Sequence, residues 1–317
     1  MYSLQIQNLL MKKIYQIFII FLFAYSCSSN KKKVKDNIVL SNKFNFGIEI
    51  GTIRNNKIKE ASGLAHSIMN SNSLWVHNDS GDGPFLYLIS TIDSKYYGNI
   101  KIKGINNEDW EDLAIGPSIF NEDSSFIYIG EIGDNKKNKK IKKIYFFKEP
   151  KITDFSKTIE IDDFYTIQFS TDKKIEDFET LMIDPNSKEI FIVSKSKKKK
   201  QKIYKIKTKN IDLNKIQVAK KILSLDFKSY NGKITGGDIS YDGNECLIKT
   251  YDNIFYWKKK HDQKWENIWG SSPTILNYNP EPQGEAICWS LDSQSYFTLS
   301  ENENENENQK LYKYSKN

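Results

Sequence analysis

The segment Asp109-Trp-Glu-Asp-Leu-Ala114 decides the fold, because related segments recur four more times along the chain. The other copies are Glu60-Ala-Ser-Gly-Leu-Ala65, Asp177-Phe-Glu-Thr-Leu-Met182, Thr235-Gly-Gly-Asp-Ile-Ser240 and Gln283-Gly-Glu-Ala-Ile-Cys288. Each copy begins with a polar residue and has Leu or Ile at its fifth position. Repeats of roughly 40–50 residues that are built from short strands are typical of β-propellers.

Two further apolar runs follow each copy of the segment. The second runs cover residues 74–76, 126–129, 190–193, 246–248 and 296–299, and the third runs cover 85–89, 144–147, 203–206, 254–257 and 311–314. They are rich in Ile, Tyr and Phe and are separated by Gly, Asn and Asp, which favours strands over helices. Candidates for a fourth, outer strand lie at 97–102, 164–169, 216–218 and 265–269.

The fold expected from this pattern is all-β, a single β-propeller with five blades. Six blades is the alternative, because the interval between Asp109 and Asp177 is the longest between copies. The last repeat has no outer strand of its own, and the run at residues 44–50 has no repeat before it. We therefore expect this N-terminal strand to pair with the last blade and close the ring, which removes exposed sheet edges.

The N-terminal residues have the pattern of a targeting segment. Met11-Lys-Lys13 is basic, residues 14–24 are apolar, and Cys27 follows small residues. This ending resembles the lipobox of bacterial lipoproteins, which implies that Cys27 becomes a lipid-carrying N-terminus. We expect a lipoprotein signal peptide at 1–27, a polar tether at 28–43 and the propeller domain at 44–317. The alternatives are an uncleaved membrane anchor and an ordinary secretory signal. The predicted location is the bacterial envelope, lipid-anchored on the periplasmic face or the cell surface.

Charge and cysteine content exclude some functions. The formal net charge is +7, but the lysines are spread along the chain without a recognition motif, so nucleic acid is not expected as a partner. Cys246 and Cys288 fall in predicted strands, where we expect core packing; a disulfide between them is the alternative. The sequence contains no Gly-x-Ser-x-Gly elbow, no Cys/His zinc spacing and no Walker loop.

Acidic residues gather where the repeats would meet. In a propeller the first strands line the central channel, and the loops between the second and third strands emerge on the same face. The candidate binding residues at the starts of the first strands are Glu60, Asp109, Glu111, Asp177, Glu179, Asp238 and Glu285. Those in the loops are His77, Asn78, Asp79, Asp82, Glu131, Asp134 and Asn135. Together they predict a shared polar site, although each carboxylate could instead cap a turn.

A cation would relieve the repulsion between such carboxylates, and calcium accepts many oxygen ligands in loose geometry. The predicted metal ligands are Asp79, Asp82, Glu111, Glu131 and Asp134. The spacing is not that of an EF-hand. His77, beside Asp79, is a candidate base or ligand, with a structural role as the alternative.

The motifs E-A-S-G-L-A, L-W-V-H-N-D-S-G-D, D-W-E-D-L-A-I-G-P, Y-I-G-E-I-G-D-N, T-G-G-D-I-S-Y-D-G and Q-G-E-A-I occur in this order between about residues 45 and 315. Together they resemble a family of secreted bacterial β-propeller proteins, commonly labelled WD40-like or hypothetical. The resemblance implies a propeller with an acidic top face and no established activity. More distantly, the chain is similar in composition to phytase-like and esterase-like calcium propellers.

Three classes of function are compatible with these features. The first is a binding or scaffold module that holds a metal, a glycan, a peptide or another small molecule. The alternative is a calcium-assisted hydrolase of a phosphate ester or other ester, and the third is a structural envelope protein. Trp75 and Trp110 flank the acidic motifs and would suit either a sugar platform or the core.

Overall fold

The computed structural model describes residues 40–120, 123–196, 200–225, 233–301 and 309–317. The predicted signal peptide, Cys27 and residues 28–39 of the predicted tether lie outside the described residues. Strands dominate the described part of the chain, where the one helix is the short α2 (Trp265–Ile268). The all-β class is therefore confirmed. No helix in this part is both long and apolar enough to cross a membrane.

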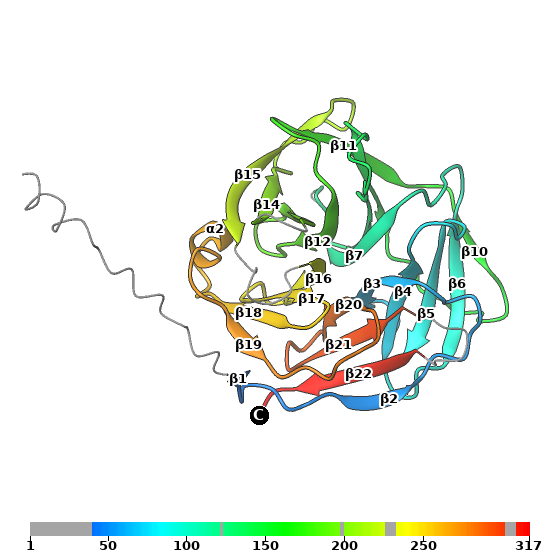
Figure 1. The fold of residues 1–317 in the computed structure, drawn as a ribbon. Coiled ribbons are helices and arrows are strands. Elements are labelled where there is room, and N and C mark those ends of the chain that lie inside the picture. Colours follow the sequence, from blue (N-terminus) through cyan, green and yellow to red (C-terminus); the bar gives the residue numbers. More distant parts are fainter. Residues whose placement is uncertain (1–39, 121–122, 197–199, 226–232, 302–308) are drawn as a thin grey trace, which may run out of the picture. The chain divides into compact units, whose positions relative to one another are not determined.

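Most strands fall into five consecutive groups with antiparallel neighbours, which we call the first to fifth strand groups (Figure 1). The first group is β3 (Ala61–His66), β4 (Ser73–Asn78), β5 (Phe85–Ser90) and β6 (Tyr96–Ile102). The second is β7 (Trp110–Pro117), β8 (Ser125–Glu131), β9 (Lys142–Lys148) and β11 (Tyr165–Thr171). The third is β12 (Phe178–Ile183), β13 (Ile190–Ser194), β14 (Gln201–Ile206) and β15 (Gln217–Leu225).

The fourth group is β16 (Ile234–Ile239), β17 (Glu245–Thr250), β18 (Ile254–Lys258) and β19 (Thr274–Leu276). The fifth is β20 (Gly284–Trp289), β21 (Ser295–Ser300), β22 (Lys310–Ser315) and β2 (Ile48–Thr52). Every second and third apolar run that the sequence pattern predicts lies inside one of these strands.

Parallel pairings at the outer edges reduce the five groups to four sheets of five, five, eight and four strands. The eight-stranded sheet arises because β11 of the second group pairs with β15 of the third. The short β10 (Ile159–Ile161) pairs with β6, and β1 (Leu40–Ser41) pairs with β19. The long interval before Asp177 therefore contributes β10 to the sheet of the first group. The end of the predicted tether contributes β1.

The fifth group joins two distant parts of the chain, because β2 pairs antiparallel with β22 (Figure 1, blue beside red). This pairing was expected for residues 44–50; the strand itself begins at Ile48, and before it Phe44 forms an isolated antiparallel bridge with Lys316. The Asn279 side chain takes the backbone hydrogen bonds of Gly47, accepting from its N–H at 3.2 Å and donating to its carbonyl at 2.8 Å. Phe44 is fully buried and packs on Tyr296 at 5.1 Å, so it anchors the segment as a core residue.

The first strands of the groups lie next to one another. β3 contacts β7, β7 contacts β12, β12 contacts β16, β16 contacts β20, and β20 contacts β3. Among the described residues, five apolar clusters fill the spaces between successive groups. Inner strands such as β12 and β17 are buried on both faces because a neighbouring group covers each face. Most residues of the outer β15 are instead exposed or partly exposed.

The predicted outer strand at 265–269 is wrong. Trp265 and Trp269 lie on one side of the helical turn α2, stack at 5.3 Å and are almost fully buried. Trp269 also meets Phe191 edge-on at 4.9 Å. The outer strand is β19 instead. Cys246 and Cys288 are buried free thiols, as expected for core residues.

Candidate functional site

A β-bulge lies near the start of every first strand. The register of β3, β7, β12, β16 and β20 shifts there by one extra residue. The extra residues are Ser62, Glu111, Glu179, Thr235 and Glu285. A bulge bends its strand and re-aims the extra side chain. Three glutamates therefore occupy equivalent positions in three strand groups.

Asp238 lies outside this set, although the sequence places it among the acids near the starts of the first strands. The bulge in β16 falls at Thr235 and not at Gly237, which aligns with Glu111 in the sequence repeats. Asp238 therefore lies beyond the bulge of β16, further along the strand than Glu111 lies in β7. It accepts a hydrogen bond from the Trp289 N–H at 2.8 Å and lines a cavity of about 30 Å³ together with His66. Burial raises the pKa of Asp238 to about 7.

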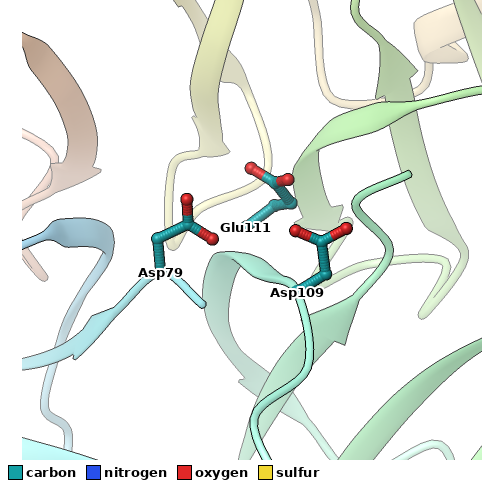
Figure 2. A group of neighbouring side chains, drawn as sticks. All are labelled: Asp79, Asp109 and Glu111. Atoms are coloured by element: carbon teal, nitrogen blue, oxygen red, sulfur yellow. The ribbon is translucent and has the colours of Figure 1, made fainter. Parts of the chain in front are cut away.

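The sequence-predicted carboxylates that do meet are Asp79, Asp109, Glu111, Asp177 and Glu179, which we call the acidic cluster. Glu111 is its centre: one of its oxygens lies within 4.8 Å of oxygens of Asp79 and Asp109, and one lies within 4.8 Å of oxygens of Asp177 and Glu179. Figure 2 shows Asp79, which follows β4, beside Asp109 and Glu111 at the start of β7. Three strand groups thus supply one cluster.

Glu111 is buried without a direct hydrogen-bond or ion-pair partner among the described residues. Its exposed fraction is 4%. Burial raises the pKa of Glu111 well above its usual range, the charges of Glu179 and Asp79 raise it further, and the charge of Lys195 opposes the rise. Gly133 makes room for this carboxylate, because a Cβ there would lie 2.1 Å from Glu111 Oε1 and 2.5 Å from Asp109 Cγ. Sequence reasoning missed Gly133, although the glycine of the Glu131–Asn135 motif was a signal.

The neighbouring carboxylates are only partly compensated. Lys195 Nζ lies 2.8 Å from Glu179 Oε2, while Glu179 Oε1 is buried without a partner. Burial raises the pKa of Glu179 to about 8, although Lys195 opposes the rise. Asp177 Oδ1 accepts the N–H of Asp134 at 2.7 Å. Burial raises the pKa of Asp79 to about 6 despite a backbone hydrogen bond from Ser80, and nearby carboxylates add to the rise.

The fifth strand group adds acids beside the cluster. Glu285 accepts a hydrogen bond from the Tyr251 hydroxyl at 2.7 Å. Glu301 lies near Glu285. Burial is the main cause that raises the pKa of Glu301 to about 9, and the charges of Glu285 and Asp79 add to the rise. Glu60, also predicted for the site, is exposed, and its charge acts on Asp79 and Glu301. The region is therefore strongly acidic beyond the cluster itself.

Asn78 and Asp82 hold the loop after β4. The Asn78 amide oxygen accepts the N–H groups of Lys59 and Glu60, and its nitrogen donates to Asp82 Oδ2 at 2.7 Å. The Tyr87 hydroxyl donates to the same Asp82 oxygen at 2.8 Å. Asn78 also donates to the Lys57 carbonyl oxygen at 2.7 Å, and Asp82 Oδ1 accepts the N–H of Gly83 at 2.7 Å. Both side chains are therefore engaged in holding this loop and the start of β3, outside the acidic cluster.

Glu131, Asp134 and Asn135 are also placed outside the cluster. Asp134 accepts two backbone N–H groups of its own loop and pairs with Lys142 Nζ at 3.3 Å. These contacts outweigh burial and lower its pKa. Glu131 accepts the N–H of Glu108 at 3.1 Å. Asn135 is exposed. Of the five predicted metal ligands, Asp79 and Glu111 therefore meet, and the other three stabilise loops.

His77 is a buried structural residue. Its Nδ1 lies 2.8 Å from the Asn78 carbonyl oxygen, and its ring meets Trp110 edge-on at 5.6 Å. Burial lowers the pKa of His77 to about 4, so the imidazole is neutral at pH 7. Trp110 and Trp75 are fully buried, and the Trp75 indole donates to Glu149 at 3.0 Å. Neither tryptophan offers an open platform for a sugar.

The chemistry available at the acidic cluster is that of hard oxygen donors gathered around a buried, unpartnered carboxylate. Such donors suit calcium or magnesium, and a buried charge needs a compensating partner. Comparison of the sequence with models of known protein families and with curated proteins found no match to either.

Proposed function

We propose that the chain is a lipid-anchored protein of the bacterial envelope, folded as a five-bladed β-propeller that binds calcium at its acidic cluster. The propeller is supported by the five strand groups, by the order in which their first strands touch and by the apolar clusters between them. The lipid anchor rests on the apolar run at 14–24 and on Cys27.

The observation that carries the cation site is the Glu111 carboxylate. It is buried and has no hydrogen-bond or ion-pair partner among the described residues. Its oxygens lie within 4.8 Å of Asp79 and Asp109 and within 4.8 Å of Asp177 and Glu179. A buried carboxylate without a counter-charge costs several kcal/mol, so a bound cation would stabilise the arrangement. Asp79, Asp109 and Glu111 would hold the ion. Calcium suits ligands that come from separate loops, because its coordination is less strict than that of magnesium.

In this proposal calcium serves a binding or scaffold module. An ion held by Asp79 and Asp109 ties the loop after β4 to the segment that enters β7. Those loops would then present a fixed surface to a glycan, a peptide or another small molecule. A module of this kind on the outside of a membrane would meet such ligands directly.

The second candidate function is calcium-assisted hydrolysis of a phosphate ester or other ester. The observation that favours it is Glu179, whose pKa of about 8 makes it a group able to exchange a proton near neutral pH beside the cation site. A screen against phosphate esters and aryl esters, with calcium and with chelator, tests this function. Calcium-dependent turnover that is lost in Glu179→Gln would establish hydrolysis and displace the binding module.

Calcium binding is tested on the full chain after metal is stripped with chelator. At a hundredfold excess over the dissociation constant, calcium should stabilise the protein by about 2.7 kcal/mol. Chelator should remove the gain, and Asp79→Asn should reduce it. Magnesium should give a smaller gain. A melting temperature indifferent to both calcium and chelator would contradict the proposed cation site.

The lipid anchor is tested separately by fractionating cells that produce the wild type or Cys27→Ala. The variant should leave the membrane fraction, because it has no thiol to carry the lipid. A variant that stays in the membrane pellet unchanged would contradict the anchor and would leave the calcium site unaffected.

A further inference from the structure

The acidic cluster consists of two overlapping triads that share Glu111. The first triad is Asp79, Asp109 and Glu111, and the second is Glu111, Asp177 and Glu179. In each triad the three oxygens lie within 4.8 Å of one another, so each has the dimensions of a cation site. The triads differ in the positive charge that the chain itself brings to them.

The second triad already contains an ammonium group. Lys195 Nζ lies 2.8 Å from Glu179 Oε2, and the exposed fractions of the two side chains are 16% and 0%. Lys195 begins the loop after β13, and its own N–H donates to the Asp177 carbonyl oxygen at 2.8 Å. This hydrogen bond holds the backbone of Lys195 beside Asp177, and the Lys195 side chain reaches Glu179. The ammonium is therefore built into the triad.

The first triad has no comparable cation among the described residues. Within the described residues, the ion pair at this triad joins Lys139 Nζ to Asp109 Oδ2 at 3.7 Å. Lys139 is 34% exposed and lies equally far from Glu131, so it is a shared and solvated charge. Asp79 accepts one backbone N–H, from Ser80 at 2.5 Å, and Glu111 accepts none. The charge of Lys195 reaches Glu111 and opposes the rise of its pKa, but among the described residues no ammonium pairs directly with Glu111 or Asp79. This triad therefore keeps a net negative charge.

We propose that Lys195 acts as a tethered cation that fills the second triad, so that the cluster takes one external divalent cation, in the first triad. This inference rests on the proposed cation-binding function. The lysine ammonium is a compact charge with three donors and can replace a metal ion among carboxylates. Removal of the ammonium, with the aliphatic stem kept, should open the second triad to a second ion.

The test is the number of calcium ions bound per full chain, measured by isothermal titration and by metal analysis after gel filtration. The wild type should bind one ion and Lys195→Met should bind two. Lys139→Met is the matched control: it removes the same charge beside the first triad and should leave the number at one. Glu179→Gln in the Lys195→Met background should return the number to one, because it removes a ligand of the second triad.

Two results would overturn the role of Lys195: two ions in the wild type, or one ion in a folded Lys195→Met protein. Lys195→Gln gives the same test with a polar side chain, should the methionine variant fail to fold. Calcium absent from the wild type and from every variant would instead refute the proposed cation site. The two failures are therefore distinguishable.

Discussion

Replacement of Glu111 by Gln should stabilise the metal-free protein and abolish its response to calcium. Two carboxylates 4.8 Å apart repel by about 3.5 kcal/mol at an effective dielectric constant of 20. Glu111 can avoid this repulsion by taking up a proton, which costs about 3 kcal/mol at pH 7 for a carboxyl group of ordinary pKa 4.5. The repulsion therefore cannot destabilise the protein by more than about this amount. Gln has nearly the same shape and no charge. The substitution should therefore recover up to about 3 kcal/mol, which corresponds to a rise in melting temperature of roughly 5–10 °C.

Calcium should stabilise the wild type by a similar amount, about 2.7 kcal/mol at a hundredfold excess over its dissociation constant. The substitution and the ion relieve the same repulsion, so their effects should not add. Melting curves of both proteins at pH 7, in chelator and in calcium, measure all four states. Glu108→Gln is the matched control: Glu108 lies in the segment before β7 but its side chain is 64% exposed, so we expect little change.

Two results would refute this reasoning. A Glu111→Gln protein that melts below the wild type in chelator would show that the Glu111 charge is compensated in the native state. A full calcium response in the variant would show that the ion binds elsewhere.

Three further predictions concern other parts of the molecule. Burial raises the pKa of Asp238 to about 7, so the stability that its protonated form contributes is lost as pH rises from about 4 through 7. In urea unfolding, the stability of Asp238→Asn relative to the wild type should therefore be greater at pH 8 than at pH 5. An equal difference at the two pH values would contradict this. Deletion of 311–317 removes most of β22 and unpairs β2, so it should lower the melting temperature far more than deletion of 28–38, and equal effects would refute the pairing. Gly133→Ala should weaken calcium binding at least tenfold in a titration, because its Cβ would displace the Glu111 carboxylate. Unchanged calcium affinity would show that the space left by Gly133 is not needed for binding.

Local patterns determined the positions of most strands. Apolar runs such as 126–129 and 190–193 need only their own β-branched and aromatic residues to be recognised, and the structure has strands at both. The repeated acidic segment also predicted that Asp109, Glu111 and Glu179 would meet, because equivalent positions of repeated units lie in equivalent places. The sequence by itself therefore determined the all-β class and the core of the acidic cluster.

Only the tertiary structure decided the features that depend on register and on contacts between distant segments. Asp238 lies outside the cluster because the β16 bulge falls at Thr235, and bulge position depends on pairing with β17. Trp265 and Trp269 bracket a helical turn, and Trp269 packs against Phe191 of the third strand group, a contact that the local sequence does not reveal. The approach of Lys195 to Glu179, on which the charge of the cluster depends, follows from how β12 and the loop after β13 meet in space. Short segments carry no record of these long-range contacts, because the contacts form only when the strand groups pack together.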